Sequence, residues 1–136
     1  MSAPFEISRI AAHAASPMGE WLGFSGEADG ESAVYKLAFS EEHIGNPMIR
    51  ALHGGVIAAF LEFAMQADLA ARLEAGAPIS TATMAIDYLA SSRAEDMRAR
   101  VRIMRLGRRI AFLEATGWQA DEAQPVAIGR ASLRIG

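Results

Sequence analysis

The chain has 136 residues, a net charge of −3 and no cysteine. With 51% hydrophobic and 21% charged residues it has the composition of an ordinary globular protein, and we expect one domain over residues 1–136. The acidic balance argues against nucleic acid as the main partner. The lack of cysteine excludes disulfides, a thiolate nucleophile and cysteine-based zinc sites.

The first 39 residues predict a short helix followed by two strands. Residues 5–12 have the pattern of an amphipathic helix, which Ser16-Pro17 breaks. Strands are predicted at 20–27 and 32–39, because Asp29-Gly30 between them is a strong turn signal. No basic region followed by an apolar stretch is evident at the start, and we expect a soluble cytoplasmic protein that does not enter a membrane.

The strongest helix signal runs from about His53 to Glu74, after a loop over residues 40–52. Good helix formers fill this segment, and a glycine and a proline close behind it end the helix. Its first half is apolar on every side, which predicts a buried helix. Its second half, with Asp68, Arg72 and Glu74, is predicted to be amphipathic.

Four more strands are predicted, at residues 79–89, 96–106, 109–119 and 124–135. In the second of them a period of two separates Met97, Ala99, Val101, Ile103 and Arg105 from Arg98, Arg100, Arg102 and Met104. Asp87, in the first of them, is either a second functional acid or an outward-facing residue, and its alternation with Ile86 and Tyr88 favours the outward-facing position. The order of elements predicts an α+β fold in which an antiparallel sheet of five or six strands curls around one long central helix.

Glu62 is the only polar side chain in the apolar run from Gly54 to Met65. Burying an unpaired carboxylate costs several kcal/mol, roughly, and no Lys or Arg lies one helical turn away to pair with it. A lone carboxylate in apolar surroundings has the character of a general base or a nucleophile. In the alternative interpretation, Glu62 emerges at the surface or meets an arginine from a strand.

The start of the predicted helix offers a second group of candidates. At His53-Gly54-Gly55 the backbone N–H groups lack intrahelical partners and the helix dipole adds positive charge, so an oxyanion would be stabilised there. Alternatively, the glycines only ease a tight entry into the helix. Asn46, in the preceding loop, could bind a water or a carbonyl, or serve as a turn residue.

Together these residues resemble the PaaI-like branch of the hotdog-fold thioesterases. The matching residues are Asn46-Pro47, Leu52-His53-Gly54-Gly55, Glu62 nine residues after the histidine, Thr81, Ile86-Asp87-Tyr88-Leu89 and Gly107-Arg108. The resemblance implies the hotdog fold and hydrolysis of an acyl-CoA or another acyl or aryl thioester. It implies no metal, and no cofactor beyond the CoA that forms part of the substrate.

The resemblance also assigns roles to residues. Glu62 is the catalytic acid, and the Gly54 N–H polarises the thioester carbonyl. His53 shapes the site, Asn46 positions water or the carbonyl, and Thr81 binds the attacking water. The expected substrate contacts are Gly55, Arg93, Arg108 and Arg109, whereas the other arginines of this region are expected to form a solvated strand face. In this family two subunits share each site, so we expect a homodimer, or a tetramer of two such dimers.

Two alternatives come from other functional classes. A hotdog protein that binds acyl or aryl thioesters without turnover would keep the pocket but release no thiol. A hotdog dehydratase or hydratase would carry its catalytic histidine in a differently patterned segment, whereas Gly-Gly follows His53 here.

Overall fold

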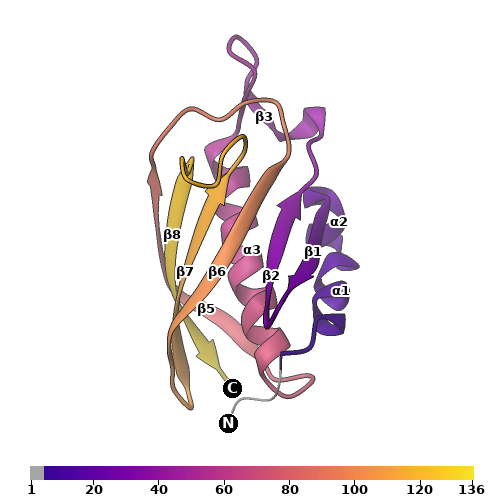
Figure 1. Ribbon diagram of the computed structural model, residues 1–136, viewed down its shortest axis with the longest axis vertical. Coiled ribbons are helices and arrows are strands. Elements are labelled where there is room, and N and C mark those ends of the chain that lie inside the picture. The colour runs from indigo at the N-terminus through magenta and orange to yellow at the C-terminus, as the bar shows by residue number, and fades with distance from the viewer. Residues whose placement is uncertain (1–4) are drawn as a thin grey trace.

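A computed structural model describes residues 5–136, and Figure 1 shows its helices and strands. The helices are α1 (Ser8–Ala14), α2 (Pro17–Leu22) and α3 (Gly54–Arg72), with a 3₁₀ turn, η1, at Glu41–His43. The strands are β1 (Phe24–Asp29), β2 (Ser32–Leu37), β3 (Ile44–Asn46), β4 (Ala51–Leu52), β5 (Ile79–Tyr88), β6 (Met97–Leu106), β7 (Ile110–Trp118) and β8 (Ala127–Ile135).

Six of these strands form one antiparallel sheet in the order β1-β2-β6-β7-β8-β5. The sheet curls around α3, and α1 and α2 pack beside β1 (Figure 1). This is the predicted arrangement of an antiparallel sheet wrapped around a long central helix, the hotdog fold. β5 lies at one edge of the sheet, and its outer side has no strand partner among residues 5–136.

Alternation along the strands places apolar side chains between the sheet and α3. In β6, Met97 and Ala99 are buried while Arg98 is exposed, as the period of two predicts. The prediction that Arg105 continues the inner set is wrong, because the pairing of β6 with β7 shifts register between Ile103 and Arg105. The extra residue in β6 turns Arg105 to the exposed face.

Residues 20–22 end a helix and do not begin the first strand as predicted. Ser16 caps α2 by accepting a hydrogen bond from the Gly19 N–H, and Pro17 takes the first helical position, where its missing N–H is not needed. Gly23 ends α2 in the left-handed region with φ of 64°. The Ser-Pro pair, which was predicted only to break α1, therefore also starts a second helix.

α3 is the predicted central helix, and its buried side chains form much of the core. Its length and composition would also suit a membrane span, but more than half of that stretch is buried inside the fold. The expectation that its first half is buried on every side is wrong for one face. Ala58, Glu62 and Gln66, spaced four residues apart on that face, are only half buried.

Asp68 lies in the second half of α3, yet its side chain is only 1% exposed. It accepts hydrogen bonds from the Tyr35 hydroxyl at 2.6 Å and from the Arg72 ε N–H at 2.8 Å. Burial, and then the charge and hydrogen bond of Asp68, hold the pKa of Tyr35 far above its ordinary value. This network fastens β2 to α3 and departs from the predicted amphipathic pattern.

The hairpin of β3 and β4 connects the sheet to α3 and projects from the end of the molecule at which α3 begins (Figure 1). Gly45 passes so close to His53 that a Cβ on Gly45 would lie 2.6 Å from the His53 Cα. At the base of the hairpin, the buried His43 ring accepts the Ser40 N–H and bonds to the Trp21 carbonyl oxygen. The His43 carbonyl oxygen accepts the His53 N–H at 2.8 Å, and this bond holds the hairpin against the first turn of α3.

Charged side chains cross the outer face of the sheet, away from α3. A row of ion pairs over β6, β7, β8 and β5 is formed by Arg102, Glu114, Arg130 and Asp87. Asp87 faces outward, 3.6 Å from Arg130, and the prediction for this residue is confirmed. The row includes Arg102, one of the arginines that were predicted to form a solvated strand face.

Candidate active site

His53 is the N-cap of α3 and engages two of the amides that a helix start leaves without intrahelical partners, those of Gly55 and Val56, and it also accepts the first regular helix bond, from Ile57. Its Nδ1 accepts the Gly55 N–H at 2.8 Å, and its carbonyl oxygen accepts the N–H groups of Val56 and Ile57. The Gly54 N–H has no acceptor within residues 5–136. The first turn of a 19-residue helix therefore keeps one amide free at its positive end, on the glycine predicted to bind the oxyanion.

Glu62 lies about two turns further along α3, on the half-buried face that it shares with Ala58 and Gln66. None of the ion pairs of residues 5–136 includes Glu62, so no strand arginine neutralises its charge there. Its neighbours in the sequence are leucine and phenylalanine. A carboxylate that is partly shielded from water and has no charged partner suits a base or a nucleophile.

Gln66 was not predicted as a site residue, but it connects the face of Glu62 to Thr81. The Gln66 side-chain amide donates to the Thr81 Oγ1 at 3.0 Å, one helical turn beyond Glu62. This contact joins the start of β5 to α3. The spacing of four residues from Glu62 was the available signal, because residues at this interval share a helix face.

Asn46 is exposed in the β3–β4 hairpin, and its Oδ1 accepts the Met48 N–H at 3.1 Å. This is the turn role that the sequence left open. Within residues 5–136 no hydrogen bond joins Asn46 to Gly54 or Glu62. Asn46 thus lies in the hairpin that precedes the start of α3, but no hydrogen bond connects it to the predicted catalytic residues within residues 5–136.

The three predicted substrate-binding arginines are divided between the two ends of α3. Arg93 lies in the loop after β5, which is tied to β4 because Ser92 Oγ accepts the Leu52 N–H at 3.0 Å. It therefore lies near the start of α3. Arg108 and Arg109 lie in the turn between β6 and β7, at the opposite end of the molecule (Figure 1).

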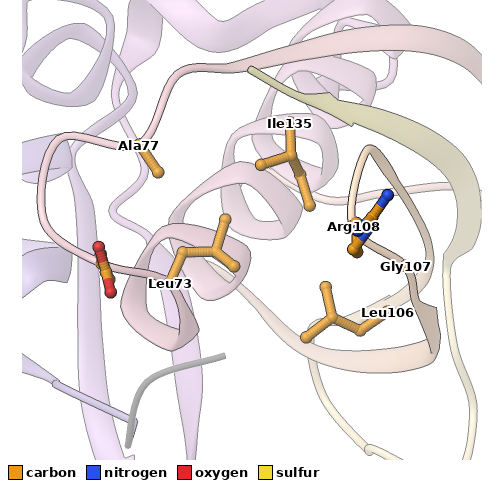
Figure 2. A pocket seen from close by; sticks show the side chains of 7 residues that line it. Leu73, Ala77, Leu106, Gly107, Arg108 and Ile135 are labelled. Atoms are coloured by element: carbon orange, nitrogen blue, oxygen red, sulfur yellow. The ribbon is translucent and has the colours of Figure 1, made fainter. Parts of the chain in front are cut away.

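A hollow of about 500 Å³ opens beside the last turn of α3. Figure 2 shows the residues around it, which are Leu73, Glu74, Ala77, Leu106, Gly107, Arg108 and Ile135. Neither Glu62 nor Gly54 lines this hollow, and the rise of α3 separates Leu73 from Glu62 by about 16 Å. Within one chain the hollow is therefore distinct from the predicted catalytic residues.

Tyr88 is a second residue at the site that the sequence did not assign a role. Its hydroxyl donates to the Gly54 carbonyl oxygen at 2.7 Å. A Cβ added to Gly54 would meet this hydroxyl at 3.4 Å, an ordinary contact distance. Tyr88 belongs to the segment through which the family was identified, but only the fold shows that the end of β5 meets the start of α3.

Comparisons with known proteins agree with this architecture. The family model of the thioesterase superfamily matches residues 50–134. A solved protein from the thioesterase superfamily is 32% identical, with a TM-score of 0.83 over 96% of this chain and 97% of that one. A phenylacetic acid degradation-related protein from Ralstonia eutropha JMP134 is 25% identical, with a TM-score of 0.81 over 94% and 98%.

A thioesterase from Haemophilus influenzae shares the fold, with 21% identity and a TM-score of 0.84 over 98% of this chain and 92% of that one. No curated protein matches the chain. The chain belongs to the thioesterase superfamily, and the resemblance to hotdog-fold thioesterases of the PaaI-like branch is confirmed. It is a thioester hydrolase.

Proposed function

We propose that this thioesterase hydrolyses acyl-CoA or aryl-CoA, with Glu62 as base or nucleophile and Gly54 of a partner subunit as oxyanion donor. The proposal rests on one observation above all. A single helix carries a half-buried carboxylate that forms no ion pair and one N-terminal amide without an acceptor, both within residues 5–136. Thioester hydrolysis needs these two groups, one to activate or replace water and one to hold the developing negative charge.

The reaction follows from their chemistry. As a general base, Glu62 takes a proton from water while the water oxygen attacks the carbonyl carbon. The carbonyl oxygen becomes negatively charged, and the Gly54 N–H stabilises it. The C–S bond then breaks, and the proton held by Glu62 passes to the departing thiolate. As a nucleophile, Glu62 instead attacks the carbonyl carbon itself, the C–S bond breaks and the thiolate leaves, to be protonated by solvent. Water then hydrolyses the mixed anhydride, which releases the acid and restores the Glu62 carboxylate.

The spacing along α3 supports a site shared by two subunits. Gly54 and Glu62 are eight residues apart, a rise of about 12 Å. Their hydrogen bonds to one thioester carbonyl and its attacking water must each be about 3 Å long. If the α3 helix of a second subunit runs antiparallel to the first, that subunit places its own Gly54 beside Glu62. The amide and the carboxylate that serve one site are then closer together than they are within one chain.

The edge of the sheet supports the same proposal. β5 has ten residues and no partner on its outer side within residues 5–136, and such an edge favours pairing with another strand. At the opposite edge, α1 and α2 pack beside β1. We therefore propose a homodimer that forms along β5, with a pair of dimers as the larger assembly.

The unpaired arginines support CoA as the carrier. Arg93, Arg108 and Arg109 are exposed, and none forms an ion pair within residues 5–136. Each guanidinium is thus available to bind phosphate.

Two variants test the two groups separately. Gly54→Pro removes the amide at the first helical position, where proline is favoured, and the extended His53 backbone (φ −62°, ψ 132°) suits a following proline. Glu62→Gln removes the base. We expect each variant to lose thiol release from acyl-CoA. Gly54→Ala, which keeps the N–H and adds a Cβ at ordinary contact distance, should stay active.

Mixing the two inactive variants then locates the site. A mixed dimer contains one site with an intact Glu62 and an intact Gly54, so random exchange of subunits should restore about a quarter of the wild-type activity. If each site is built within one chain, the mixture stays inactive. Wild-type rates of thiol release by both variants would overturn the proposed mechanism.

A further inference from the structure

One peptide group at the start of α3 is held from both sides. The Gly54 carbonyl oxygen accepts the Tyr88 hydroxyl at 2.7 Å, and the N–H of the same peptide group, on Gly55, donates to His53 Nδ1 at 2.8 Å. Tyr88 is the last residue of β5, so this peptide joins the edge strand to the helix cap.

Two consecutive glycines would otherwise leave the first turn of α3 loosely defined. Glycine has the widest range of backbone conformations, and the first residues of a helix have no intrahelical bonds from their own N–H groups. The Gly54 N–H belongs to the preceding peptide group, whose His53 carbonyl oxygen accepts the Val56 and Ile57 N–H groups. With the peptide groups on both sides of Gly54 held, the direction of the Gly54 N–H, which binds the oxyanion in the proposed reaction, is set.

The same bonds define the state of His53. Because Nδ1 accepts the Gly55 N–H, the network assigns the proton of the neutral ring to Nε2. The hydroxyl, the peptide and the imidazole form a chain of donors and acceptors that point the same way. Each bond in such a chain strengthens the next by about 10–30%. His53 is exposed, so its Nε2–H can reach a ligand at the start of the helix.

We propose that Tyr88 is a positioning residue of this thioesterase, whose hydroxyl orients the Gly54 amide and fixes the tautomer of His53 through the peptide between them. The inference rests on the proposed role of Gly54. Tyr88→Phe removes only the hydroxyl oxygen and keeps the ring, so it should cost little packing. The chain also holds a matched control, because Tyr35, its only other tyrosine, donates to Asp68 in the core.

The test compares Tyr88→Phe with Tyr35→Phe, using thiol release from acyl-CoA and thermal unfolding. For Tyr88→Phe we expect kcat to fall about fivefold to tenfold, with KM within about twofold and Tm unchanged. For Tyr35→Phe we expect a lower Tm and a normal kcat. In ¹⁵N spectra of histidine-labelled protein, the His53 signals should show a fixed Nε2–H tautomer that Tyr88→Phe loosens and Tyr35→Phe does not. Loss of the signals in His53→Gln assigns them.

A double variant separates this inference from the proposed function. In the Gly54→Pro background, Tyr88→Phe should cause no further loss, because Tyr88 acts through the Gly54 amide. An inactive Gly54→Pro together with a wild-type kcat for Tyr88→Phe overturns the role of Tyr88 and leaves the proposed function standing. A raised KM with normal kcat would instead make Tyr88 a substrate contact. A fully active Gly54→Pro removes the oxyanion role and the inference with it.

Discussion

The two halves of α3 each carry an acid, and the fold surrounds the two acids differently. Asp68, in the second half, is buried and bonded to Tyr35 and Arg72. Glu62, in the first half, is half buried and has no charged partner within residues 5–136. The second half therefore contributes a paired acid that holds elements together, and the first half keeps an acid available for chemistry.

The two ends of the helix differ in the same way. At the last turn, the Leu73 carbonyl oxygen accepts a hydrogen bond from Arg9 of α1. At the first turn, the Gly54 N–H has no acceptor within residues 5–136. One continuous helix thus combines a stabilised end with a reactive end. Variants that remove the acid of one half at a time test this division.

The largest effect is expected on activity. Glu62→Gln should lower kcat for acyl-CoA hydrolysis by roughly 10²- to 10⁴-fold, because it removes the group that activates water or attacks the carbonyl. Asp68→Asn is the matched control on the same helix and should change kcat of the folded protein by less than about twofold. Thiol release measures both. Equal losses in the two variants would mean that the two acids do not differ in role.

The converse effect is expected on stability. Asp68→Ala should lower the free energy of unfolding by about 2–4 kcal/mol, because it leaves the Tyr35 hydroxyl and Arg72 without their shared acceptor. Glu62→Ala should change it by less than about 1 kcal/mol, since no bond of residues 5–136 is lost. Denaturant unfolding followed by circular dichroism checks both values. A more destabilised Glu62→Ala would contradict the division between the halves.

A smaller effect is expected in alkaline solution. Burial and Asp68 raise the pKa of Tyr35, so the folded chain keeps this proton above pH ~10, where an unfolded tyrosine loses it. The unfolded state then binds fewer protons, and stability should fall by up to ~1.4 kcal/mol per pH unit above 10. Tyr35→Phe should lack this contribution and Tyr88→Phe should keep it. Identical slopes for both variants and the wild type would refute this account.

Much of the fold follows from local patterns. The central helix and the strands after it were predicted within a few residues, because long apolar segments and clear turn signals define them. The helix α2 was missed, since Ser16-Pro17 signals a break and a new start equally well. The burial of Asp68 could not be predicted, because its partner Tyr35 lies 33 residues earlier in the chain.

The site was predictable in part. The apolar neighbours of Glu62 predicted a base or nucleophile at this position, and the family resemblance predicted thioester chemistry. The contact between Tyr88 and Gly54 depends on where β5 ends relative to α3, which no local pattern specifies. The remaining site residues depend on the partner subunit that we propose, and a single sequence gives no register for pairing along β5.

Ala58 lies midway between Gly54 and Glu62 on the half-buried face of α3. In a two-fold dimer that joins Glu62 to the partner's Gly54, the midpoint of this interval lies beside the symmetry axis, so Ala58 faces its own copy. Any substitution of Ala58 would therefore be present in both subunits at the same point of the interface. In such a dimer, Ala58→Leu would replace two facing methyl groups by two branched side chains. It would therefore act on both active sites at once.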